Sequence, residues 1–153
     1  MNMMIFLLLF SMFIFLIYEC ILHGSRMKKG TLLYDKAKKR SNETGKPLLV
    51  IGNPESSFKN KLFGTAYGCG DVCLDIVGCG SCKTSIKSDA LQYVRGLSDN
   101  SYVIFESCVL EMIPEKDLLQ TEIERVSGND TYQVRSGGLT QYIFPLFRRI
   151  IPY

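Results

Sequence analysis

The chain has 153 residues, of which 46% are hydrophobic and 22% charged, a balance that suits one folded domain and excludes a disordered chain. Its net charge of +3 is unevenly spread. Residues 24–46 hold eight basic and two acidic side chains, a net of +6, whereas residues 47–153 hold ten basic and twelve acidic ones, a net of −2. A nucleic-acid-binding domain needs positive charge on its folded surface, so no nucleic-acid partner is expected.

An apolar segment opens the chain. Residues 3–18 have no charged side chain, and the apolar run continues beyond Glu19 to Leu22. About 20 such residues are enough to cross a hydrocarbon layer as a helix. A cleaved signal peptide would have a basic start, a shorter apolar stretch and a small-residue cleavage site, which this segment lacks. We therefore expect residues 1–23 to be an uncleaved signal-anchor, a transmembrane helix that makes this a single-pass membrane protein.

The basic residues 24–46 follow the apolar run directly. Positive charge beside a membrane span is typical of the cytoplasmic side, and it also favours an anionic leaflet. We expect this stretch to be a juxtamembrane linker with one short helix over residues 31–40, and residues 47–153 to form a domain on the cytoplasmic side.

Short apolar runs alternate with helical patterns from residue 47 onward. The expected strands are 47–51, 71–77, 85–87, 101–106, 131–135 and 139–144, the expected helices are 55–63, 90–94 and 115–126, and residues 145–153 form an apolar tail. Such alternation indicates a three-layer α/β sandwich with a mostly parallel sheet. Because little chain remains after Arg135, the sheet should be reduced to five or six strands.

Ligands of parallel sheets bind beyond the carboxyl ends of the strands, near the point where the strand order reverses. The residues expected there are Gly52-Asn53, Asp75-Ile76, Asp89-Ala90 and Glu106. A carboxylate after the second strand can accept hydrogen bonds from both hydroxyls of a ribose, and one in the next loop can accept from an adenine amino group. Alternatively, each acid caps a helix or a turn.

Four of the six cysteines lie within fourteen residues, at Cys69, Cys73, Cys79 and Cys82. Two close pairs are typical of a four-thiolate zinc site, which would make the protein a zinc-stabilised membrane adaptor. A disulfide is the second alternative, although disulfides are rare in cytosolic domains. We expect free thiols instead, because Cys73 falls inside a predicted strand. His23 is the only histidine and adjoins the membrane, so Cys-His and Ser-His catalysis are not expected.

The segments LLVIGNP, DVCLDI, SDAL, DNSYVIFESCVLEMIP and EIERVSG resemble, in this order, class I S-adenosylmethionine-dependent methyltransferases. The resemblance covers about residues 47–136 and is most specific over 99–126. There an apolar strand leads into Ser107-x-x-Leu110-Glu111, and a helix ends in Glu122-x-x-Arg125-Val126 before a glycine turn. The resemblance implies a Rossmann-like sheet and S-adenosylmethionine as the cofactor, with Asp75 on its ribose and Asp89 on its adenine. The full set of candidate cofactor-binding residues is Gly52, Asn53, Asp75, Ile76, Asp89, Ala90 and Glu106.

Two features depart from that family. The family's glycine-rich loop is replaced by Gly52-Asn53-Pro54, and only thirteen residues separate Asp75 from Asp89, too few for a full helix. The expected function is a membrane-anchored methyltransferase-like protein with an unknown acceptor and no assigned catalytic residue. The alternative is a catalytically inactive scaffold or structural membrane protein. The chain is also similar to small membrane-anchored methyltransferase-like proteins of large DNA viruses, so that alternative includes a component of a virion.

Overall fold

A computed structural model describes residues 3–53, 67–80 and 82–135. Within these residues the helices are α1 (Met3–Thr44), α3 (Ala90–Arg95) and α4 (Lys116–Ser127). The strands are β1 (Leu48–Ile51), β2 (Val72–Asp75), β3 (Ser85–Lys87), β4 (Val103–Ser107) and β5 (Thr131–Val134). The expected helix at 55–63, the expected strand at 139–144 and the apolar tail lie outside the described residues.

The described strands form one parallel sheet in the order β3-β2-β1-β4-β5. The chain starts in the middle at β1, moves outward through β2 and β3, and then crosses to β4 and β5 on the other side. This is the doubly wound, Rossmann-like arrangement, and its order reverses between β1 and β4. The predicted α/β fold class is confirmed.

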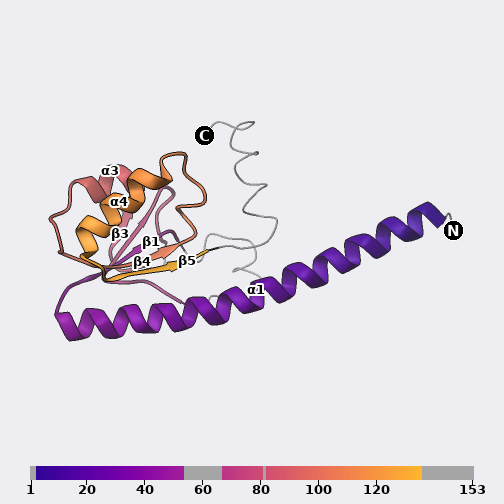
Figure 1. The fold of residues 1–153 in the computed structure, drawn as a ribbon, viewed down its shortest axis with the longest axis horizontal. Coiled ribbons are helices and arrows are strands. Elements are labelled where there is room, and N and C mark those ends of the chain that lie inside the picture. Colours follow the sequence, from indigo (N-terminus) through magenta and orange to yellow (C-terminus); the bar gives the residue numbers. More distant parts are fainter. Residues whose placement is uncertain (1–2, 54–66, 81, 136–153) are drawn as a thin grey trace.

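Helices cover both faces of the sheet, which gives three layers (Figure 1). Successive strand residues point to opposite faces, so the core has two halves. The half under α1 includes Val50, Cys73 and Phe105, and the half under α3 and α4 includes Leu49, Leu74 and Ile104. Because both faces are buried, the central strands are apolar without alternation, as parallel sheets require.

Helix α1 differs most from expectation. It is a single helix of 42 residues, and its C-terminal part lies across the sheet while its N-terminal part projects away (Figure 1). The buried residues of α1 are His23, Gly30, Ala37 and Ser41. Their spacing of seven, seven and four residues is that of one helical stripe. The basic stretch expected as a linker with a short helix is therefore a layer of the domain.

Two sets of polar contacts hold the helices in place. At the end of α1, Arg40 Nε and Lys46 Nζ lie 2.7 and 3.4 Å from the two carboxylate oxygens of Asp130, just before β5. In α4, the Arg125 guanidinium donates to the backbone carbonyls of Val94 (3.3 Å) and Leu97 (3.0 Å), where α3 ends. The first set joins the end of α1 to the residue before β5, and the second joins α4 to the end of α3.

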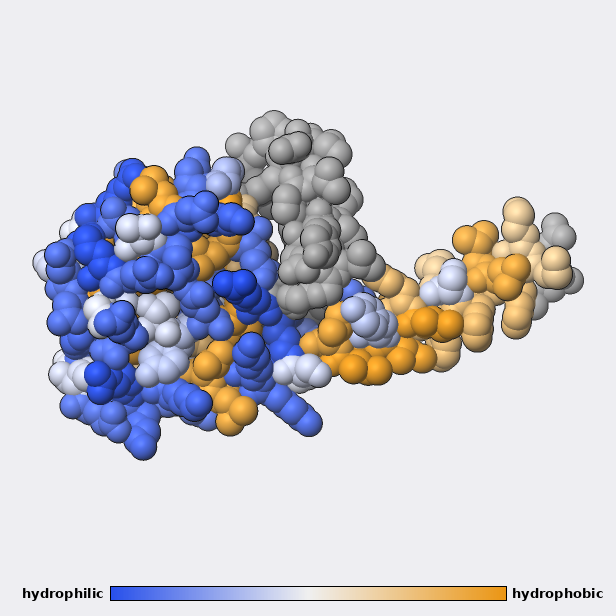
Figure 2. Space-filling model, viewed as in Figure 1, coloured by the Kyte–Doolittle hydropathy of each residue, from blue (hydrophilic) through white to orange (hydrophobic). Residues whose placement is uncertain are grey.

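The N-terminal part of α1 is long and apolar enough to cross a membrane, and none of that window is buried against the rest of the described residues. Figure 2 shows this contrast: the visible surface of the domain is mainly hydrophilic, whereas the projecting part of α1 is hydrophobic. At a rise of about 1.5 Å per residue, the run from Met3 to Leu22 is about 30 Å long. Because α1 is continuous, the candidate span is joined to the sheet without a hinge among the described residues.

Candidate functional site at the carboxyl edge of the sheet

The parallel sheet brings the predicted site residues to one edge. Ile51, the last residue of β1, is in register with Leu74 of β2 on one side and with Glu106 of β4 on the other. Gly52 and Asn53 follow β1, and Asp75 ends β2. The carboxyl ends of β1, β2 and β4 therefore lie side by side, at the place where the strand order reverses.

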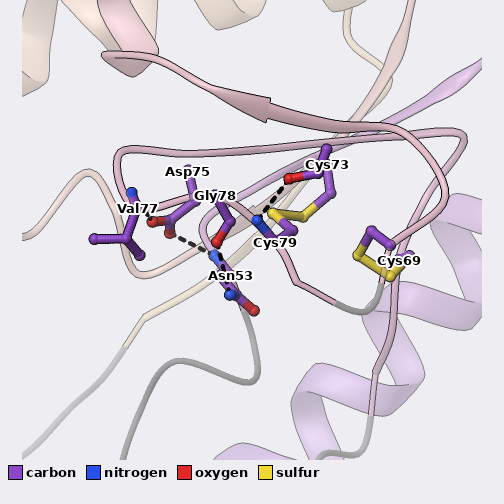
Figure 3. Close-up of a disulfide and its surroundings, with 9 residues drawn as sticks. Asn53, Cys69, Cys73, Asp75, Val77, Gly78 and Cys79 are labelled. Carbon is purple, nitrogen blue, oxygen red and sulfur yellow. Dashed lines mark hydrogen bonds between the residues drawn. A yellow bond between two sulfur atoms is a disulfide. The ribbon is translucent and has the colours of Figure 1, made fainter.

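Asp75 connects two of these strand ends. Its Oδ2 accepts a hydrogen bond from the backbone N of Asn53 (2.7 Å), and its Oδ1 accepts from the backbone N of Val77 (2.9 Å) (Figure 3). The Asn53 side chain also donates to the carbonyl of Gly78 (2.9 Å). A carboxylate offers about four lone-pair sites, so both oxygens of Asp75 can still accept from a ligand. Its first role is nevertheless to hold the loop after β1.

Two apolar side chains follow Asp75. Ile76 is 57% exposed and Val77 is 65% exposed. Single exposed apolar side chains need no explanation, but this pair directly follows a carboxylate at the strand-order reversal. An apolar surface next to a hydrogen-bond acceptor suits the flat ring and the ribose hydroxyls of a nucleoside.

Glycine is required at position 52, because the backbone there passes close to Ser107 and Val109. Its φ is +93°, and a Cβ there would lie 2.7 Å from Val109 Cγ2 and 2.8 Å from the carbonyl oxygen of Ser107. Only glycine fits both that conformation and that contact. The loop after β1 is thus pressed against the end of β4.

Glu106 is a buried acid whose carboxylate is hydrogen-bonded to backbone amides. Its side chain is 1% exposed, and its Oε1 accepts hydrogen bonds from the backbone N of Val109 and of Leu110, the latter at 3.0 Å. Burial raises the pKa of this carboxyl from 4.5 to about 7, although the two backbone amides oppose the shift. Glu106 therefore caps the turn after β4, the alternative that the sequence left open for each acid.

Asp89 has a capping role as well. It is the N-cap of α3, and its Oδ1 accepts from the backbone N of Gln92 (3.0 Å). Asp89 is exposed, and Ala90 is the first residue of the helix. These contacts neither require nor exclude the predicted contact with adenine, which stays a prediction.

The cysteine cluster contradicts the expectation of free thiols. Cys69 is bonded to Cys82 and Cys73 to Cys79, while Cys20 and Cys108 are free. We expected strand β2 to keep Cys73 apart from the others. Instead, the chain turns back after β2 at Gly78, whose φ is +87°, and brings Cys79 against Cys73 (Figure 3).

Two structural residues of this region were not predicted. Asp71 Oδ2 accepts from the backbone N of Leu48 (2.7 Å), so Asp71 and Asp75 pin the two ends of β1 in the same way. Tyr67, which is buried, shares a hydrogen bond with Ser107 Oγ (3.1 Å). Asp71 precedes the short strand β2 and Asp75 ends it. This pair of acids was the signal in the sequence from which the role of Asp71 could have been predicted.

Comparison with protein-family models, with curated proteins and with solved structures finds no match for this chain. The class of protein is therefore defined by the fold alone: a Rossmann-like α/β domain that carries one long apolar N-terminal helix.

Proposed function

We propose that this protein is a membrane-anchored, methyltransferase-like protein that binds the adenosyl part of S-adenosylmethionine at the carboxyl edge of its sheet. The observation that carries the proposal is the position of Asp75, which ends β2 beside the strand-order reversal and is followed by two exposed apolar side chains. The similarity of residues 99–126 to the methyltransferase family supports the same conclusion.

The residues present fit the adenosyl group better than the methionine part. Asp75 would accept from the ribose hydroxyls, and Ile76 with Val77 would contact the ring. Bound S-adenosylmethionine would supply an activated methyl group to the acceptor. The protein's contribution to such a transfer is mainly the alignment of donor and acceptor, for which the described residues offer no assigned base.

A second candidate function is a scaffold without catalysis. It is favoured by Gly52, which lies against the Ser107 carbonyl where the family's loop approaches the cofactor. It is also favoured by Glu106, whose carboxylate accepts from the backbone amides of Val109 and Leu110. In this alternative the domain keeps the sheet and the anchor but has lost the donor pocket.

Calorimetric titration of the full chain in detergent with S-adenosylhomocysteine tests the proposal. We expect saturable binding, because the product carries the same adenosyl group as the cofactor. The absence of any binding heat at millimolar ligand would contradict the proposal and leave the scaffold function.

Asp75→Asn tests the site, with Asp71→Asn as its matched control. Each substitution weakens one backbone contact at an end of β1, so both should lower the melting temperature. Only Asp75 lies at the carboxyl edge. Losing a charge-assisted contact costs about 1.5–3 kcal/mol, or roughly tenfold to more than a hundredfold in affinity. We therefore expect Asp75→Asn, and not Asp71→Asn, to reduce binding by that factor. Equal binding by both variants would place the ligand elsewhere.

A further inference from the structure

Three cysteine sulfur atoms cluster in the structure, and a fourth is bonded to one of them. The two disulfides are not independent bridges, because the Sγ atoms of Cys73, Cys79 and Cys82 all lie within 4.8 Å of one another. The fourth sulfur, of Cys69, is bonded to Cys82. Two disulfides that each cross-linked a separate part of the chain would not need to be adjacent.

A turn presents two of the four cysteines, Cys79 and Cys82, whereas Cys73 lies in β2. The backbone N of Cys82 donates to the Cys79 carbonyl (3.1 Å), the bond of a turn from residue i to i+3, and the backbone N of Cys79 donates to Ser85 Oγ (2.7 Å). The positive φ of Gly78 directs the chain back toward β2. A turn that carries two cysteines three positions apart, near two further cysteines, is the usual construction of a structural zinc site.

The dimensions of the cluster suit a tetrahedral ion. Zinc–thiolate bonds of about 2.3 Å give sulfur–sulfur edges of about 3.8 Å. The Cα atoms of the two bonded pairs are 5.4 and 6.1 Å apart, so rotation of the side chains is enough to open each pair to that distance.

The basic residues of α1 bear on whether the four cysteines form disulfides or bind a metal as thiolates. Its basic residues directly follow the apolar run and favour the cytoplasmic side for the domain, where thiols stay reduced and disulfides are rare. Soft thiolates in a set of four select zinc or iron–sulfur chemistry among the common metals, and a single tetrahedral position suits one zinc ion.

We propose that Cys69, Cys73, Cys79 and Cys82 bind one structural zinc ion in the cell instead of pairing as disulfides. The newly made chain carries four thiols, so no reductant is needed: each thiol releases its proton, and each thiolate donates an electron pair to the ion. The zinc joins the segment before β2 to the loop after it. Because Tyr34 of α1 donates to the Cys69 carbonyl, the site also supports the contact between the anchor helix and the sheet. This proposal is independent of any adenosyl ligand.

The test is a metal and thiol count on the full chain, extracted in detergent from membranes of a bacterial host without added metal or chelator. We expect about one zinc per chain by elemental analysis, released by a chelator with a fall in melting temperature. After release in denaturant without reductant, all six cysteines should react with a thiol reagent. Two reactive thiols and no zinc would overturn the proposal, as would six thiols without zinc, or iron in its place.

Serine variants locate the ion. Cys79→Ser and Cys82→Ser should each lower the zinc content about tenfold or more, because three ligands hold a structural zinc far less tightly than four. Cys20→Ser is the matched control, since Cys20 is an exposed free thiol of α1. Unchanged zinc in both cluster variants would overturn the proposal. If these variants do not fold, the counts on the unaltered chain decide it.

Discussion

Gly30 of helix α1 lies directly against the ring of Tyr67: a Cβ on Gly30 would be 2.4 Å from Tyr67 Cε1. The same ring packs edge-on against Phe105 of β4, with their centroids 5.0 Å apart. Helix, connecting segment and central strand are thus in contact through one aromatic side chain. The absence of a side chain at position 30 lets α1 lie close enough to cover the sheet.

We predict that Gly30→Leu destabilises the domain, because the added side chain must displace either Tyr67 or the helix. Overpacking of this kind typically costs about 1–3 kcal/mol. Gly24→Leu is the matched control, since a Cβ at Gly24 meets nothing within 4 Å and leucine is the better helix former. Thermal unfolding of the full chain in detergent measures both. Equal melting temperatures for the two variants would contradict the close approach.

We predict that lysine cannot replace Arg125 without a loss of thermal stability. Its guanidinium donates to Glu122 (2.8 Å) and to the Val94 and Leu97 carbonyls at the end of α3. Lysine keeps the charge but lacks the planar fork. We expect Arg125→Lys to lower the melting temperature clearly and Arg95→Lys, at an exposed position of α3, to leave it nearly unchanged. The arginine of the family-like Glu-x-x-Arg-Val segment would then be structural.

Glu106 predicts a pH dependence of stability. Because its folded pKa is raised from 4.5 to about 7 by burial, the folded state binds the proton more tightly than the unfolded state. Its contribution to the free energy of unfolding is therefore fully present below about pH 4.5 and is lost as the pH rises to about 7, by an amount on the order of 3 kcal/mol.

Glu106→Gln should remove that dependence, because the amide keeps an acceptor oxygen for Val109 and Leu110 but does not titrate. The measurement is the melting temperature of both chains at pH 5 and pH 8, on either side of the raised pKa. Parallel changes in the two chains would show that other groups cause the dependence.

The apolar N-terminal part of α1 gives a separate prediction. Residues 3–22 are expected to span the bilayer once, so alkaline carbonate should leave the chain in the membrane pellet. In sealed vesicles with the cytoplasmic face outward, added protease should digest the domain. Protection of the domain would reverse the predicted orientation and would also favour the disulfides over zinc, because the domain would then lie in an oxidising compartment.

Local patterns in the sequence were enough for much of the fold. The apolar run at Leu48–Ile51, the apolar start of Val103–Ser107 and the one-sided apolar face of α4 each follow from the order of neighbouring residues. Their alternation predicted the class of the sheet, and the turn signals around Gly128 predicted the end of α4. For the same reason the candidate edge, with Asp75 among its residues, was recognisable before any contact was known.

Contacts between distant residues decided the rest. The covering role of α1 depends on Gly30 meeting a ring 37 positions away, and nothing in the basic stretch itself signals that partner. The use of Asp75 to hold the Asn53 amide, and the turn that brings Cys79 to Cys73, likewise depend on how the loops close after the strands have paired. A sequence pattern records which face a residue prefers, because that preference is set by its neighbours along the chain. Which group lies opposite is set only when the layers pack, and that is why the tertiary structure alone determined the partners of Gly30, Asp75 and the cysteines.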